Sequence, residues 1–186
     1  CPVYCTPFAA QILALKLKEA GLDEQVPVKV IEAGSKFTAG PFACEFVSVT
    51  HSIPEPTALL IKTKQGTVLH SGDWKIDRSP VLGQGMDEKR LRAIGGEGVD
   101  VLVCDSTNVL REGHSPSEAD VSDTLMQIVT HATGRVAVTT FASHVDRIAA
   151  AIRAARANGR EVVIAGRAMR NTIEAARACG MLKDSG

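Results

Sequence analysis

Three polar residues whose side chains can bind metals or move protons each follow an apolar stretch of the sequence. They are His51, Asp73 and Asp105, and the stretches before them are rich in Val, Leu and Thr. In layered α/β proteins, strand ends present side chains to the crevice where ligands bind. An imidazole and two carboxylates are ligand types that hold Zn²⁺ or Mn²⁺ and activate a bound water. The alternative for each position is a hydrogen-bonded turn or strand-end residue without a metal.

The first half of the chain must supply two of these strand ends, and its pattern predicts a sheet with one helix. Thr6 and Pro7 are expected to open the helix and Gly21 to end it. Lys64-Gln65-Gly66 is predicted to form a hairpin turn between two strands. The predicted strands are Val26–Ile31, Phe42–Thr50, Thr57–Thr63 and Thr67–His70.

The second half alternates between strand-like and helix-like segments, which favours parallel βαβ units. Strands are predicted at Val99–Cys104, Arg135–Phe141 and Glu161–Ala165. Ser115-Pro116-Ser117-Glu118 is expected to open a helix that runs to about His131. Further helices are expected from a Ser143 cap to Gly159 and from Arg167 to Cys179. The boundary between the two halves is predicted in the polar stretch Asn108–Ser115.

Composition excludes several classes of protein. The chain has 186 residues, of which 45% are hydrophobic and 23% charged, and its formal net charge is zero. Disorder and a polycationic nucleic-acid clamp are both poor interpretations of these values. No apolar run approaches the length of a bilayer span, so no membrane partner is expected. Five scattered cysteines fit reduced thiols and a cytoplasmic location.

The neutral total conceals a charge asymmetry. Residues 97–134 hold seven acidic residues and one basic residue, whereas residues 135–186 hold nine basic and four acidic residues. Most of these bases are arginines between positions 147 and 177. They form either a solvated helix face or a surface for backbone phosphates.

Several short motifs occur in an order that resembles one family. The motifs are Pro2-Val3-Tyr4-Cys5-Thr6-Pro7, Val49-Thr50-His51-Ser52-Ile53-Pro54, Leu69-His70-Ser71-Gly72-Asp73-Trp74-Lys75, Cys104-Asp105-Ser106-Thr107-Asn108, His114-Ser115-Pro116-Ser117-Glu118, Phe141-Ala142-Ser143 and Gly166-Arg167-Ala168-Met169. Together they resemble the ribonuclease J group of the metallo-β-lactamase and β-CASP superfamily. No single motif is decisive, but the resemblance covers the chain nearly end to end.

The resemblance implies a fold and roles for particular residues. It implies an α/β fold, with part of a metallo-β-lactamase αββα sandwich at residues 1–110 and part of a parallel β-CASP domain at residues 111–186. His51 would be a terminal ligand of one metal, and Asp73 would bridge two metals and act in catalysis. Asp105, the second catalytic candidate, would hydrogen-bond to the ligand residues. The intact protein would hold two divalent ions, Zn²⁺ or Mn²⁺.

One departure from the family limits what this chain is expected to do alone. The family's main ligand cluster, HxHxDH, occurs nowhere in the sequence, and its remaining ligand histidine is expected beyond Gly186. Together with the start at Cys1, this indicates an incomplete piece of a larger protein. We therefore expect the piece to be inactive and to bind metal weakly or not at all.

The predicted partner is RNA, contacted at Ser143, Gly166 and Arg167. Helix N-termini present free N–H groups to phosphates, although simple caps and turns explain these residues equally well. His144 stands where relatives carry Asn, which puts an RNA contact there in doubt. Trp74 is expected to pack in the core rather than on a base. His70 is expected to pack or to support the site without binding metal.

The resemblance predicts RNA phosphodiester hydrolysis in RNA processing and decay. Cleavage would be endonucleolytic, with 5′-exonucleolytic cleavage as a further option, in a homo-oligomer. One alternative is a module that binds nucleotide or RNA phosphates without chemistry. Another is a metallo-β-lactamase-fold hydrolase that acts on DNA or a small ester. The HxHxDH cluster distinguishes the enzyme from the binding module.

Overall fold

Thr6, Pro7 and Gly21 set the limits of the first helix, as predicted. In the computed structural model, which describes residues 1–182, α1 spans Pro7–Ala20. Gly21 follows it in the left-handed conformation (φ 66°), where its N–H donates to backbone carbonyls of the last turn. Glycine adopts this conformation without the steric cost that other residues meet. The helix therefore ends where the sequence places its C-cap.

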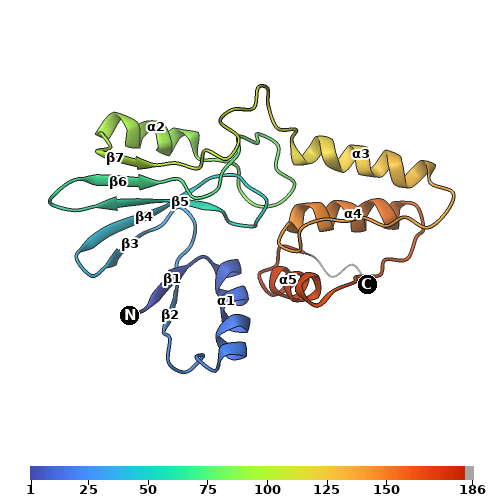
Figure 1. The fold of residues 1–186 in the computed structure, drawn as a ribbon, viewed down its shortest axis with the longest axis horizontal. Helices are drawn as coiled ribbons and strands as arrows, with labels where there is room; N and C mark the ends of the chain where they lie inside the picture. Colours follow the sequence, from blue (N-terminus) through green and yellow to red (C-terminus); the bar gives the residue numbers. More distant parts are fainter. Residues whose placement is uncertain (183–186) are drawn as a thin grey trace. The chain divides into compact units, whose positions relative to one another are not determined.

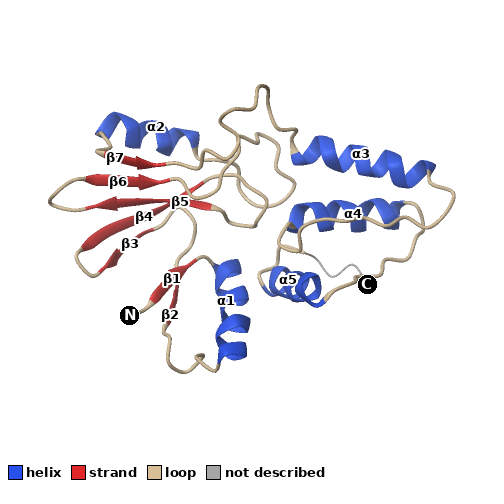
Figure 2. Cartoon of the chain, in the orientation of Figure 1, coloured by secondary structure: helices blue, strands red, loops and turns tan. Residues whose placement is uncertain are grey.

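A mixed five-stranded sheet forms the centre of the first half (Figures 1 and 2). Its strands are β3 (Lys36–Ala39), β4 (Phe42–Ser48), β5 (Thr57–Lys62), β6 (Thr67–His70) and β7 (Val101–Val103), in that spatial order. The first four pair antiparallel, and β6 pairs parallel with β7. The turn between β5 and β6 contains Lys64-Gln65-Gly66, and Thr63 N–H donates to Gly66 O at 3.0 Å. The hairpin and the mixed α/β class are thus confirmed.

One face of this sheet packs under α2 (Glu88–Glu97), a helix that the sequence analysis did not predict. The buried core consists of Val47, Val49, Ala58, Leu60 and Ile94. The helix carries Gly95 and Gly96, which weaken helix propensity and obscure its pattern. Packing of the apolar Ile94 side chain, which is 1% exposed, outweighs that cost.

The other face of the sheet carries an aromatic cluster. A separate parallel sheet is formed by two short strands, β1 (Val3–Cys5) and β2 (Val28–Val30). The sequence analysis did not predict this pairing. The Tyr4 ring stacks on Phe37 at 5.1 Å between centroids, and Phe37 meets Phe46 edge-on at 4.9 Å. These ring contacts join the small sheet to the larger one.

An ion-pair network holds α2 to the sheet. Arg90 donates to both carboxylate oxygens of Glu45, at 2.6 and 2.9 Å, and to Glu97 at 2.7 Å. Lys62 also donates to Glu97, at 2.6 Å. The hydrogen bond from Arg90 lowers the pKa of the buried Glu45. Hydrogen bonds from Lys62 and Arg90 lower the pKa of Glu97 to about 2.

These shifts predict acid-sensitive stability. A carboxyl whose folded pKa lies below its unfolded value of about 4.3 stabilises the fold at higher pH, and that contribution is lost as pH falls through the folded pKa. We expect the free energy of unfolding to fall between about pH 5 and pH 2, and Glu45→Gln to flatten part of that dependence. Urea unfolding followed by Trp74 fluorescence at pH 7 and pH 3 measures this. Glu19→Gln, at an exposed pair with Lys16, is the control. Equal pH dependence in Glu45→Gln and wild type would contradict the prediction.

Up to residue 182, the helices of the second half are α3 (Glu118–His131), α4 (Val145–Ala157) and α5 (Arg167–Ala178). The capping box of α3 is confirmed as a feature, but it lies at Ser117 and Asp120 rather than at Ser115–Glu118. The cap of α4 was assigned wrongly to Ser143. His144 is the N-cap, and its ring Nδ1 accepts from Arg147 N–H at 3.4 Å.

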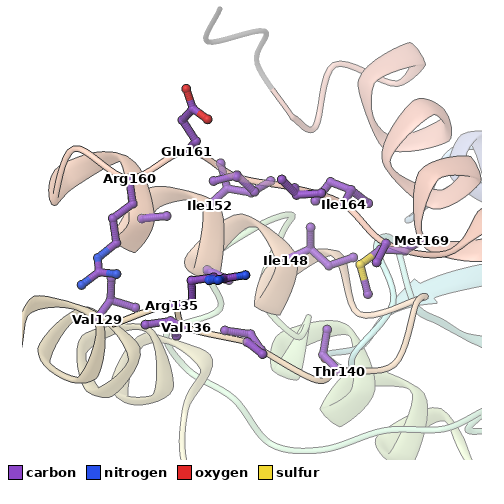
Figure 3. Close-up of a pocket in the computed structure, with 17 residues that line it drawn as sticks. Val129, Arg135, Val136, Thr140, Ile148, Ile152, Arg160, Glu161, Ile164 and Met169 are labelled. Atoms are coloured by element: carbon purple, nitrogen blue, oxygen red, sulfur yellow. The ribbon is translucent and has the colours of Figure 1, made fainter. Parts of the chain in front are cut away.

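The prediction of strands at Arg135–Phe141 and Glu161–Ala165 is wrong for the described residues. Residues 135–141 and 161–165 belong to no helix or strand. They flank a cavity of about 480 Å³, with Val136, Ile148, Ile164 and Met169 in its lining (Figure 3). A parallel strand needs a hydrogen-bonded neighbour, and across this cavity the two segments do not pair. The predicted parallel sheet is therefore not formed in residues 1–182.

The chain divides into two compact units. The first comprises Cys1–His51, Glu55–Ile76 and Gln84–Ser115, and the second comprises Ser52–Pro54, Asp77–Gly83 and Pro116 onward. The long C-terminal segment of the second unit begins at Pro116, directly after the Asn108–Ser115 stretch in which the boundary was predicted. Two short segments, Ser52–Pro54 and Asp77–Gly83, also group with the second unit. Within the part of the chain that the structure describes, no helix is both long and apolar enough to cross a bilayer.

Candidate functional site

Strand direction brings the three candidate residues to one edge of the five-stranded sheet. β4 and β6 both run antiparallel to β5, so they share a direction, and β7 runs parallel to β6. The carboxyl ends of β4, β6 and β7 therefore lie at the same edge. His51, Asp73 and Asp105 each follow one of these ends.

His51 is fixed by the pairing of the residue before it. Thr50 forms an isolated antiparallel bridge with Lys75. Lys75 N–H donates to Thr50 O at 2.8 Å, and Thr50 Oγ1 donates to Lys75 O at 2.5 Å. The half-buried His51 thus follows directly on a bridge that also fixes the segment carrying Asp73.

Asp73 stands exposed on a tight turn after β6. Ser71 N–H donates to Val103 O at 2.8 Å, which continues the pairing with the β7 strand. Gly72 has φ of 62°, and a Cβ there would lie 3.1 Å from Thr57 O, so the turn requires glycine. Gly72 N–H donates to Nδ1 of the exposed His70 at 3.0 Å. His70 therefore holds the turn and does not pack in the core.

Asp105 is held against the same turn. Its backbone N–H donates to Ser71 Oγ at 2.9 Å, and its carboxylate accepts from Thr107 N–H at 2.9 Å and Thr107 Oγ1 at 2.5 Å. Hydrogen bonds from Thr107, a backbone hydrogen bond from Trp74 and the nearby charge of His51 lower the pKa of Asp105. The carboxylate is thus ionised and lies near both the Asp73 turn and His51.

The donor types at this edge suit a divalent metal, but their number does not complete a site. Imidazole and carboxylate are ordinary ligands of Zn²⁺ and Mn²⁺, and protein sites use three or four of them. Among residues 1–182, no three His, Cys, Asp or Glu side chains are grouped so that they could hold a metal ion. Within the described residues, His51 and Asp73 therefore do not form a complete metal site.

Trp74, next to Asp73, packs against the core cluster under α2, as predicted. Its ring Nε1 is buried and has no hydrogen-bond partner among the described residues. The side chain therefore anchors the turn through apolar packing.

The predicted phosphate-binding residues belong to the second unit. Ser143 is exposed and precedes the His144 cap of α4. Gly166 (φ 100°) is the N-cap of α5, and Arg167 is its exposed first residue. The N-terminus of α5 has no hydrogen bond from a capping side chain.

Several other arginines of this unit bind the protein itself. Arg147 donates to both oxygens of the buried Glu118, at 3.1 to 3.2 Å, and Arg153 donates to Ser122 Oγ at 3.0 Å. Arg160 donates to the carbonyls of Ala132 and Gly134. These three side chains hold α4 and its flanking loop to the α3 region. The arginine-rich segment is therefore neither wholly a solvated helix face nor wholly a surface for backbone phosphates.

A buried polar network around Glu118 was missed by the sequence analysis. His144 Nε2 lies 3.4 Å from Glu118 Oε1, beside the Arg147 pair. The buried Asp77 accepts from Ser117 Oγ at 2.7 Å and from Glu118 N–H at 2.9 Å. The burial of His144 removes it from the surface available to RNA. The Ser117 cap was the sequence signal for this network, whereas Asp77 gave none.

Comparison with known proteins agrees with the predicted resemblance. A family model described as "Ribonuclease J, beta-CASP domain" matches residues 133–186. Proteins named Ribonuclease J are 50% identical in Sinorhizobium meliloti, 43% in Corynebacterium glutamicum and 35% in Helicobacter pylori. Each match covers 97–98% of this chain but only 25–32% of the relative. The chain thus spans between a quarter and a third of the length of these curated relatives.

A solved structure supports the fold. A crystal structure of a protein of unknown function from Enterococcus faecalis matches with a TM-score of 0.61 at 17% identity, over 89% of this chain and 47% of that chain. This likeness supports the mixed α/β fold. Residues 133–186 match the β-CASP domain of ribonuclease J, and nearly the whole chain is similar to a segment of proteins named Ribonuclease J.

Proposed function

We propose that the full-length protein is a metal-dependent ribonuclease that hydrolyses RNA phosphodiester bonds in RNA processing and decay. The observation that carries this proposal is that His51, Asp73 and Asp105 each follow a strand that ends at the same side of one sheet, in a chain similar to proteins named Ribonuclease J. On this proposal the chain contributes part of the active site, and segments outside it contribute the rest.

Each of the three residues has a distinct role in the proposal. His51 binds one of two divalent ions, Zn²⁺ or Mn²⁺, and Asp73 bridges both. Such ions polarise a phosphate and activate water when they are bound. Asp105 keeps a fixed negative charge beside His51, because Thr107 and Trp74 hold its carboxylate. A fixed carboxylate near a ligand imidazole orients the ring and raises its basicity.

RNA is the proposed partner, contacted through the second unit. The exposed Arg167 and the backbone N–H groups after Gly166 offer charge and hydrogen bonds to a phosphate, as does the exposed Ser143. Arg147, Arg153 and Arg160 are not part of this proposal, because their guanidinium groups bind protein atoms.

The test compares RNA with DNA of the same sequence as substrates of the full-length protein. We expect cleavage of the RNA with Mn²⁺ or Zn²⁺ present, its loss on chelation, and little cleavage of the DNA. End-labelled substrates resolved by length distinguish internal cuts from removal of 5′ nucleotides. Binding of RNA with no cleavage under any metal would favour the binding module, and equal cleavage of DNA would favour the broader hydrolase.

A further inference from the structure

We propose that Glu55 is a positioning residue for His51, because its carboxylate fastens the loop that carries His51 to the N-terminus of α1. This inference rests on the proposed function, in which His51 binds metal. Glu55 has no chemical role in it, and the contact described for its carboxylate is with α1. Glu55, His51 and α1 all belong to the first unit.

His51 lies in the loop that joins β4 to β5. The two strands pair antiparallel, and Val49 N–H donates to Pro56 O at 3.0 Å, which closes the loop at its base. Thr50, at the start of the loop, is fixed by its bridge to Lys75. The loop is therefore held firmly on the upstream side of His51, and a second contact is needed to fix its return to β5.

Glu55 supplies that second contact. Its Oε2 accepts from Phe8 N–H at 2.9 Å, although the two residues are 47 positions apart in the sequence. Pro7, the first residue of α1, has no N–H, so Phe8 carries the first free donor of the helix. The N-cap residue Thr6 makes no side-chain hydrogen bond to the helix. Glu55 thus takes the place of a local cap, with the charge that a helix N-terminus favours.

The helix that receives Glu55 is itself packed within the first unit. The Phe8 side chain is 5% exposed. α1 contacts β2, and the neighbouring β1 meets the larger sheet through the rings of Tyr4 and Phe37. The Glu55 carboxylate is thus bound to an element that has its own contacts with the rest of the unit.

The backbone of Glu55 shows that this end of the loop is constrained. Among residues 1–182, Glu55 is the only residue other than glycine with positive φ, at 53°. A side chain with a Cβ meets steric cost in this conformation, and a residue before a proline, here Pro56, favours extended backbone. Such conformations persist where surrounding contacts determine them. The hydrogen bond to α1 and the pairing of Val49 with Pro56 are those contacts.

The contact also joins two motifs that the sequence analysis treated separately. Residues 2–7 lead into α1, and residues 49–54 carry His51 and end directly before Glu55. The sequence analysis assigned no role to the first of these motifs. On this inference, it presents the N-terminus of α1 to the loop that carries His51.

The test is a double-mutant cycle on the affinity of the full-length protein for Mn²⁺ alone. Glu55→Ala is made in the wild-type protein and in His51→Ala, because a residue that acts only through His51 has no effect once His51 is removed. Glu55→Gln keeps a side-chain oxygen that can accept from Phe8 N–H. Asp87→Ala is the matched control, because the Asp87 carboxylate also caps a helix of the first unit, at 2.8 Å from Arg90 N.

We expect Glu55→Ala to lower the affinity for Mn²⁺ by about tenfold, within the range seen when supporting residues of metal sites are changed. In His51→Ala the same change should lower it by less than about twofold. With RNA as substrate, kcat should fall by about tenfold with KM within about twofold, since small displacements of reacting groups reduce rate more than binding. Glu55→Gln should recover part of each effect, and Asp87→Ala should lower thermal stability only.

An equal loss of Mn²⁺ affinity from Glu55→Ala in both backgrounds would overturn the proposal, as would no loss in the wild-type background. If Glu55→Ala does not fold, Glu55→Gly takes its place in the cycle, because it removes the carboxylate and also relieves the positive φ. If the unsubstituted protein neither binds Mn²⁺ nor cleaves RNA, the proposed function fails. Hydrogen exchange at the Phe8 and Val49 amides, which should accelerate in Glu55→Ala, then still decides whether Glu55 fastens the loop.

Discussion

Asp73→Ala in the full-length protein is expected to lower metal-dependent RNA cleavage by at least about 100-fold, the upper end of losses for residues that merely support a metal ligand. The physical reason is that a bridging carboxylate neutralises charge on two ions at once, and alanine offers no oxygen in its place. Asp73 is exposed on a turn that β7, Gly72 and His70 already hold, so the fold should be retained. The measurement is the initial cleavage rate at saturating Mn²⁺.

Asp87→Ala provides the matched control for this prediction. Asp87 caps α2 by accepting from Arg90 N–H at 2.8 Å, on the same unit but away from the three candidate positions in sequence. Its loss should cost about 1 kcal/mol of stability and leave the cleavage rate unchanged. Equal rates for Asp73→Ala and wild type would remove Asp73 from the proposed site.

The isolated chain of residues 1–186 is expected to cleave no RNA and to bind Mn²⁺ or Zn²⁺ at least about 100-fold more weakly than the full-length protein. Stable metal sites require three or four ligands in fixed geometry, and binding free energy is lost with each missing ligand. His51 and Asp73 supply two. Calorimetric titration with each metal measures the affinity, and an RNA cleavage assay on the purified chain measures the activity.

Binding of RNA by the same isolated chain separates recognition from chemistry. Phosphate contacts at Arg167 need no metal, so weak binding that falls steeply with salt is expected, and Arg167→Gln should weaken it. Arg153→Gln is the control, since Arg153 already donates to Ser122. Metal-dependent cleavage by the purified chain that persists with Asp73→Ala would show that the site lies elsewhere.

The sequence predicted features that depend on neighbours along the chain. Pro7 and Gly21 defined α1, and Lys64–Gly66 defined the hairpin, because helix ends and tight turns are local. The placement of His51 and Asp73 after β strands followed from apolar runs alone. Their placement beyond strands that end at the same side of the sheet depends on the spatial strand order, which periodicity did not predict.

Features that depend on distant contacts were missed. The two glycines in α2 concealed a helix that only its packing on the sheet explains. Asp77 is a single acid in a polar stretch, and its function as a cap of α3 depends on a partner 40 residues away. His144, rather than Ser143, caps α4 because its ring is held by Glu118 from another helix.

The unpaired segments 135–141 and 161–165 also have a consequence for how this chain behaves in solution. Both are rich in β-branched residues and contain no proline, and Val163 is 88% exposed. Exposed segments of this composition outside a sheet can pair with strands of another molecule. We therefore expect copies of the chain to associate through these segments, and the association to increase with concentration.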